Sequence, residues 1–306
     1  MKRPERIVSL LPSSTEILCA LELQDRLVGV SHECDYPPEV VGLPVLTAPK
    51  LNPHGTSAEI DARVREIVQE GLSVYRINTD VLQTLQPDVI VTQDQCEVCA
   101  VSLPEVEEAV RCFLTPEVQI ISLRPQRLSD IWDDIRRIAQ ATGQDAVAEA
   151  VLSGLKKRIW QVEQQTRHLS RPRVACLEWL DPLMAGGNWI PELVEIAGGT
   201  SAFATAGTHS PSITWDALAA YQPDILIIMP CGFKIAQSQM DLPTLAAHPQ
   251  WQVLPAVQTN RVFVVDGNAY YNRPGPRIVD SAETLAEILH PEVCADLAPA
   301  GAYIRV

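Results

Sequence analysis

Two short motifs contain the side chains best suited to hold a metal. Cys96-x-x-Cys99 and His32-x-Cys34 each follow a short apolar run that is typical of a buried strand. Thiolate and imidazole are the ligands that zinc prefers and that iron accepts, so the four side chains would make a complete set if their loops meet. Redox cycling of Cys96 and Cys99 is the alternative, and it needs a thiol whose pKa is lowered at a helix N-terminus.

A second group of candidates is aromatic and polar, and lies where strands are expected to end. Aromatic residues are only 5% of the chain, so several of them in loops after strands indicate a flat ligand surface. An arginine beside such rings could pair with a carboxylate or phosphate of the ligand. The candidate ligand-binding residues are Tyr36, Trp179, Trp189, His209, Phe233, Tyr270, Tyr271 and Arg273.

The sequence carries none of the standard catalytic signatures. It contains no P-loop, no G-x-G-x-x-G after a strand, no H-E-x-x-H and no G-x-S-x-G. We therefore expect a non-catalytic binding protein and not an enzyme.

The composition of the chain argues against some classes of partner and of location. With 24 Lys and Arg against 38 Asp and Glu, the net charge of −14 repels phosphate backbones, which argues against a nucleic-acid partner. No apolar run reaches the roughly 18 residues that a membrane helix requires, so no membrane insertion is expected. The charged first residues lead directly into a strand, and 8 cysteines suit a reducing compartment. The expectation is a cytoplasmic monomer, or a periplasmic one if a leader has been removed.

Short apolar runs alternate with helical patterns along the chain, as in parallel sheets buried by crossover helices. Ser13-x-x-Glu16 has the spacing of a capping box and predicts the start of the first helix. The phrase "LQPDVIVTQ" returns as "YQPDILIIMP", so a helix end, turn and strand are used twice. The expected strands are 6–11, 27–31, 72–77, 88–92, 118–123, 173–179, 224–229 and 261–267.

These elements predict an α/β fold of two Rossmann-like parallel-sheet lobes joined by a long backbone helix, with a ligand cleft between the lobes. The lobes are expected at 1–127 and 171–306. A helical linker, 128–170, contains the long helix from about 145 to 169. Residues 47–80 read as an insertion whose helix begins near Ser57.

Long stretches of the sequence resemble one known family, the cobalamin-binding members of the helical-backbone (cluster A, type III) periplasmic substrate-binding proteins. The stretch "RIVSLLPSSTEILCALELQDRLVGVSHECDYPPEV" is similar to the family's opening strand, first helix and D-Y-P-P turn. "LMAGGNWIPELVEIAGG" and "NRPGPRIVDSAETLAEILHP" resemble later landmarks, in the expected order. The resemblance covers nearly the whole chain apart from 47–80.

The resemblance implies a corrinoid or another metal tetrapyrrole or metal chelate as the ligand. It matches Tyr36 to the family's cleft tyrosine, places Trp179 in a loop over the ligand and puts Arg273 at the cleft edge. It also implies an ABC permease as a partner, docked through one acidic residue on each lobe, for which Glu97 and Asp216 are the nearest counterparts.

Two alternatives remain open at this point. The protein could carry a cofactor in the cytosol instead of serving a transporter. A thiol-rich zinc, iron or redox protein built on Cys96-x-x-Cys99 with His32 and Cys34 is the second alternative; these side chains could also ligate the metal of a bound tetrapyrrole.

Overall fold

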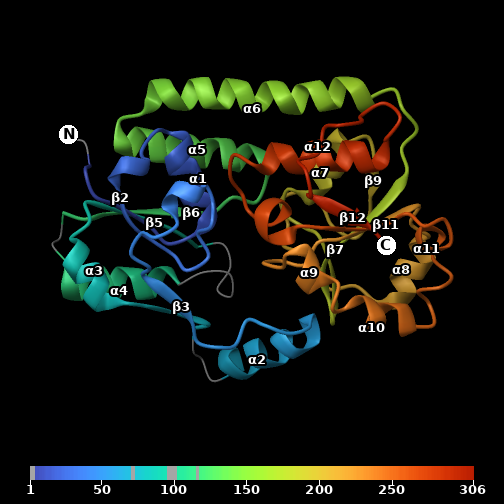
Figure 1. The fold of residues 1–306 in the computed structure, drawn as a ribbon, viewed down its shortest axis with the longest axis horizontal. Coiled ribbons are helices and arrows are strands. Elements are labelled where there is room, and N and C mark those ends of the chain that lie inside the picture. Colours follow the sequence, from blue (N-terminus) through green and yellow to red (C-terminus); the bar gives the residue numbers. More distant parts are fainter. Residues whose placement is uncertain (1–3, 70–72, 95–101, 115–116) are drawn as a thin grey trace. The chain divides into compact units, whose positions relative to one another are not determined.

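The structure is a computed structural model, and it describes residues 4–69, 73–94, 102–114 and 117–306. The chain divides into two α/β units (Figure 1). Unit 1 comprises residues 1–53, 62–125 and 129–153, and unit 2 comprises residues 54–61, 126–128 and 154–306. The division expected from the sequence, with a separate linker at 128–170, stays a prediction.

Unit 1 contains a four-stranded parallel sheet in the order β2-β1-β5-β6. Its strands are β1 (Ile7–Ser9), β2 (Leu27–Val30), β5 (Val89–Gln93) and β6 (Gln119–Leu123). Every residue of β5 is buried, which explains why this strand is continuously apolar in the sequence. The helices that begin in this half of the chain are α1 (Pro12–Ala20), α2 (Ser57–Gln69), α3 (Thr79–Leu85), α4 (Leu103–Phe113), α5 (Leu128–Thr142) and α6 (Asp145–Thr166).

Two local expectations for unit 1 are wrong. The run 72–77 gives β4 (Tyr75–Ile77), which pairs antiparallel with β3 (Thr47–Pro49) in a separate two-stranded sheet. The capping box also fails, because α1 begins at Pro12 with Leu11 as its N-cap, so Ser13 already lies inside the helix. Proline is favoured at the first helical position, and there it sets the start.

Unit 2 contains a six-stranded mixed sheet in the order β12-β11-β10-β7-β8, with β9 paired to β7. The central strands β7, β10 and β11 are parallel, whereas β8 and β12 pair antiparallel at the two ends of this order. The strands are β7 (Arg173–Leu180), β8 (Leu183–Ala185), β9 (Thr200–Ser201), β10 (Ile225–Ile228), β11 (Val262–Val265) and β12 (Tyr303–Arg305). The helices are α7 (Ile190–Ile196), α8 (Trp215–Tyr221), α9 (Ile235–Ser238), α10 (Leu242–Ala247), α11 (Pro255–Gln258) and α12 (Ile278–Leu289).

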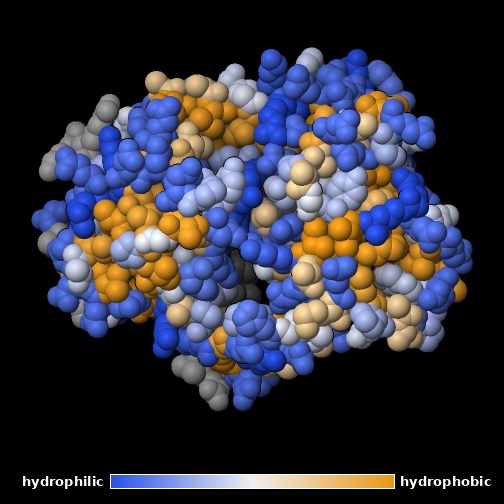
Figure 2. Space-filling model, in the orientation of Figure 1, coloured by the Kyte–Doolittle hydropathy of each residue, from blue (hydrophilic) through white to orange (hydrophobic). Residues whose placement is uncertain are grey.

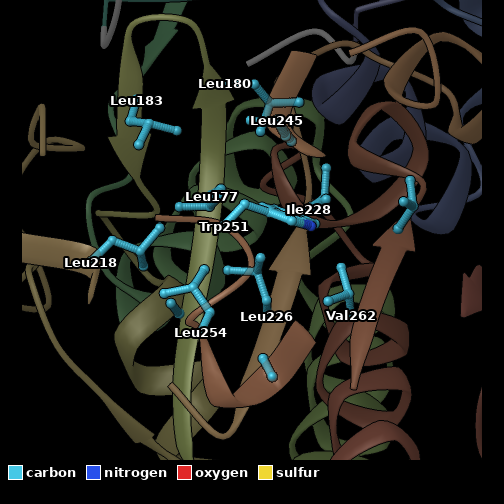
Figure 3. Close-up of a cluster of buried hydrophobic side chains, with 13 residues drawn as sticks. Leu177, Leu180, Leu183, Leu218, Leu226, Ile228, Leu245, Trp251, Leu254 and Val262 are labelled. Carbon is cyan, nitrogen blue, oxygen red and sulfur yellow. The ribbon is translucent and has the colours of Figure 1, made fainter. Parts of the chain in front are cut away.

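One face of the unit 2 sheet is buried by a large apolar cluster. Leu177, Leu226 and Val262 come from three parallel strands and pack with Leu218 of α8 and Trp251, as Figure 3 shows. Because burial of a large aliphatic side chain stabilises by roughly 1.5–3 kcal/mol, this cluster fixes the sheet whose strand ends carry the candidate site.

Helix α6 is 22 residues long, and it begins in unit 1 and ends in unit 2. Arg158 ties its second half to α12, because the guanidinium donates to the carboxylates of Asp280 and Glu283. The break expected at Thr142 is confirmed, since α5 ends there and α6 begins at Asp145.

The repeated phrase in the sequence is a repeated structure. Both α3 and α8 are 7 residues long and begin at an N-cap side chain, of Asn78 or Thr214, that accepts a backbone N–H three residues on. Both helices end at a glutamine in the left-handed conformation, with φ of 42° at Gln86 and 53° at Gln222.

The strand after each helix is fixed in the same way. The Asp88 carboxylate accepts the backbone N–H of Arg6 at 3.0 Å, and that of Asp224 accepts the backbone N–H of Arg173 at 2.8 Å. Each arginine side chain then donates to the carbonyl of the last helical residue. Residues of α3 and α8 therefore occupy equivalent positions in the two units.

Candidate functional site

Two aromatic side chains meet at the carboxyl end of the unit 2 sheet. Trp179 lies near the end of β7, and Phe233 lies in the loop after β10. Their ring centroids are 5.3 Å apart, at an interplanar angle of 65°. Trp179 is partly buried, and its Nε1 is enclosed without a hydrogen-bond partner among the described residues. A buried indole N–H without an acceptor is costly, so this donor is suited to a ligand oxygen or a bound water.

The loop after β11 is held rigidly beside that pair. Gly267 is required there, because a Cβ at this position would lie 2.2 Å from the carbonyl oxygen of Pro230. Asn272 donates to the carbonyl of Met229 at 2.9 Å, which ties the loop to the end of β10. Arg273 is only 4% exposed and donates to the side-chain oxygen of Asn268 at 3.2 Å. The guanidinium therefore braces the loop from inside.

Tyr270 and Tyr271 are neighbours with different surroundings. Tyr270 is partly buried, and the Arg277 guanidinium lies 5.3 Å from its ring centroid. Burial raises the pKa of its hydroxyl. Tyr271 is fully buried, and its carbonyl accepts the indole N–H of Trp189 at 2.9 Å. Trp189 is 4% exposed and Phe233 is 3% exposed, so burial alone does not separate them, and a ligand-binding role for Trp189 and Tyr271 stays a prediction.

A partly buried carboxylate lies next to Trp179 in the sequence. Glu178 accepts the hydroxyl of Ser210 at 2.8 Å, and Ser210 in turn accepts the backbone N–H of Gly187 at 3.0 Å. Burial raises the pKa of Glu178, and the hydrogen bond from Ser210 opposes that shift. His209 is exposed, and its Nδ1 lies 3.0 Å from the carbonyl oxygen of Ser210. The network fixes the segment that presents His209.

In unit 1, the expected residues after β2 separate into exposed and buried ones. Tyr36 is 43% exposed, so its ring is accessible to a ligand. His32 contacts Thr47, with 2.7 Å between Nδ1 and Oγ1, and burial lowers its pKa. Cys34 is buried, with its sulfur 3.0 Å from the hydroxyl of Thr15.

The structure gives no support to a thiol-based metal or redox centre. Cys96 and Cys99 lie outside the described residues. Within the described ranges, no three His, Cys, Asp or Glu side chains are grouped so that they could hold a metal ion. On β7, burial raises the pKa of Cys176 to about 12, which keeps that thiol protonated at neutral pH.

The repeated helix identifies an acidic residue that the sequence reasoning missed. Asp216 is the second residue of α8, exposed, and accepts a hydrogen bond from Gln250. The equivalent residue of α3 is Asp80, which is also exposed. It lines a shallow groove with Pro44, Val81, Thr84 and Leu85, and Figure 2 shows apolar side chains gathered over this part of unit 1. Glu97, the counterpart expected from the sequence, lies outside the described residues. Aligning the two "QPD" phrases would have found Asp80.

Comparison with known proteins places the chain in a family. The family model described as periplasmic binding protein matches residues 7–269. The chain belongs to the periplasmic binding protein family. A vitamin B12-binding protein of Vibrio cholerae is 26% identical over 290 residues, which are 93% of this chain and 89% of the relative.

Other proteins to which the chain is similar have different descriptions. An uncharacterized ABC transporter substrate-binding lipoprotein of Bacillus subtilis, YvrC, is 22% identical and covers 95% of this chain and 82% of its own length. A periplasmic heme binding protein from Pseudomonas aeruginosa has a TM-score of 0.70 at 19% identity, with 95% of this chain and 93% of that one covered. These likenesses confirm the expected α/β fold. Across the part of the chain that the structure describes, no helix is both long and apolar enough to span a membrane.

Proposed function

We propose that this periplasmic binding protein binds a metal tetrapyrrole without catalysis, with a corrinoid as the first candidate and haem as the second. The observation that carries this proposal is the Trp179–Phe233 pair at the strand ends of unit 2, where an enclosed indole N–H has no acceptor among the described residues. A corrin or porphyrin offers both an apolar ring face and polar side groups, so one ligand can contact both rings and accept that hydrogen bond. The vitamin B12-binding and heme-binding relatives support this ligand class.

Further side chains complete the proposed ligand-binding set. In unit 2, His209 and Tyr270 would contact the ligand, and Arg273 would hold the loop that carries Tyr270; a contribution from Tyr36 of unit 1 stays a prediction from the sequence. The cleft between the lobes expected from the sequence stays a prediction, as does ligation of the metal by His32, Cys34, Cys96 or Cys99.

Titration of the purified protein tests the ligand directly. Cyanocobalamin, hemin and a ferric siderophore are titrated separately, with heat measured by calorimetry and the absorbance spectrum recorded at each step. The proposal expects saturable heat with one tetrapyrrole and a shift of its absorbance bands. Saturable binding of the siderophore alone would show that the site binds iron chelates and not tetrapyrroles. If none of the three compounds binds, the proposed ligand class is wrong.

We further propose that the chain delivers its ligand to an ABC permease, docked through Asp80 and Asp216. These carboxylates occupy equivalent exposed positions on α3 and α8, so each unit offers the same acidic feature to a partner. Arginine is the residue best suited to receive such a carboxylate.

Uptake measurements separate docking from ligand binding. The double variant Asp80→Asn, Asp216→Asn should lower permease-dependent uptake at least tenfold while the ligand Kd stays unchanged, because only surface carboxylates are removed. Glu107→Gln, an exposed acid on α4, is the matched control. Full uptake with the double variant would favour the cytosolic carrier and contradict transport through these residues.

A further inference from the structure

One segment near the start of α2 belongs to a different unit from the residues on either side of it. Residues 54–61 are part of unit 2, whereas residues up to 53 and from 62 onward are part of unit 1. The helix therefore begins in unit 2 and continues into unit 1.

The contact that holds this segment in unit 2 is a capped helix start. The backbone N–H of Ser57 donates to both carboxylate oxygens of Asp241 at 3.1 Å, and the Ser57 hydroxyl donates to Oδ1 at 3.1 Å. Ser57 is fully buried, and Asp241 is 3% exposed. A carboxylate at a helix N-terminus is favoured because it satisfies backbone donors that have no partner within the helix. Gln237 adds a longer hydrogen bond to the Gly55 carbonyl at 3.4 Å.

Asp241, the N-cap of α10, lies near proposed ligand-binding residues along the chain. Phe233 is followed almost directly by α9, and Asp241 comes three residues after α9 ends. Burial raises the pKa of Asp241, and the charge of Asp181 adds to that shift. Asp181 directly follows β7, which contains Trp179. Segment 54–61 is therefore attached beside the strand ends that present the aromatic pair.

The helix buries few of its side chains, although Arg63 donates to the carbonyl of Asn52 at 3.0 Å. Only Ser57 and Ile60 of α2 are buried, and the other described positions of the helix are partly or fully exposed. A short element with few buried contacts opens at a lower free energy than the core does. Breaking the contacts of one carboxylate would release the start of α2 while leaving the sheet intact.

We propose that residues 54–61 form a latch on unit 2, closed through Ser57 and Asp241 over a ligand held at Trp179 and Phe233, and opened to admit and release that ligand. This inference rests on the proposed function, because the segment must open only if the ligand is as large as a metal chelate. The latch would retain a ligand that is bound at the aromatic surface. Its hydrogen bonds would affect the rates at which the ligand enters and leaves more than they affect the contacts of the bound ligand.

The test measures exchange and ligand rates in the same variants. Ser57→Ala removes one hydrogen bond with little change in volume, and Asp241→Asn removes the charge while keeping the shape. Glu66→Gln, exposed on the other half of α2, is the matched control. Amide hydrogen exchange over 57–61 is followed with and without cyanocobalamin or hemin, and ligand association and dissociation are followed by stopped-flow absorbance.

The latch predicts slower exchange over 57–61 when ligand is bound, and dissociation at least tenfold faster in Asp241→Asn, with a smaller increase in Ser57→Ala and none in Glu66→Gln. Wild-type binding with unchanged rates in both latch variants would overturn the latch and leave the proposed function standing. No binding of either probe by the wild type would overturn both.

Discussion

Replacing Asp134 by asparagine should change how the stability of the protein depends on pH. Asp134 lies on α5 and is 4% exposed; its Oδ1 accepts a hydrogen bond from Arg137 at 3.1 Å, and its Oδ2 is enclosed without a partner among the described residues. Burial raises the pKa of this carboxyl to about 6 from 3.8, although the Arg137 guanidinium opposes the shift.

The sign of the effect follows from proton linkage. The folded pKa lies above the unfolded one, so between about pH 4 and pH 6 the folded protein binds more protons and becomes more stable as the pH falls. A shift of about 2 pKa units corresponds to roughly 3 kcal/mol, of which about 2 kcal/mol should be gained between pH 7 and pH 4. Asp134→Asn removes this contribution, so its stability should rise less, or fall more, over that interval.

Urea unfolding of both proteins at several pH values between 4 and 7 measures the difference. Every other carboxyl is shared, so the gap between the two curves isolates Asp134. Glu107→Gln, which removes an exposed carboxylate on α4, is the matched control. Parallel curves for wild type and Asp134→Asn would refute the reasoning from burial.

Three further substitutions test the framework of unit 2. Arg158→Ala should lower the free energy of unfolding by about 2 kcal/mol, since it removes the arginine that pairs with two carboxylates of α12. Lys157→Ala, at an exposed position of the same helix, should have little effect, and urea unfolding of both variants measures the difference. Gly267→Ala should destabilise by more than about 2 kcal/mol, because its Cβ would meet backbone at 2.2 Å, and equal melting temperatures would contradict that clash. Gly154→Ala, with open space around its Cβ in a helix interior, should instead stabilise by about 1 kcal/mol.

The buried parallel strands could be predicted from the sequence because burial on both faces leaves a continuous apolar run. The runs at 88–92 and 224–229 became β5 and β10 within one residue at each end. The run at 72–77 misled, because β4 pairs antiparallel in a small sheet and its own residues are only partly buried or exposed. Apolar content alone does not distinguish these two environments.

The site was harder to predict, because position after a strand does not determine the direction of a side chain. Trp179 and Trp189 were both expected in loops at strand ends, yet the Trp189 side chain turns inward and donates to the Tyr271 carbonyl. Asp80 was missed because nothing about a lone exposed aspartate marks it, and its equivalence to Asp216 becomes visible only when the two helices and the phrases that follow them are compared. The Ser57–Asp241 contact joins residues 184 apart, a separation that no local pattern reveals.

The most direct test of the proposed tetrapyrrole site compares two tryptophans. Calorimetric titration with cyanocobalamin and with hemin is performed on wild type, on Trp179→Ala, and on Trp160→Ala, whose side chain is 57% exposed on α6. The account predicts that Trp179→Ala weakens binding of the preferred ligand about tenfold or more, while Trp160→Ala matches wild type. Equal affinity in all three proteins, or no binding by any of them, would contradict it.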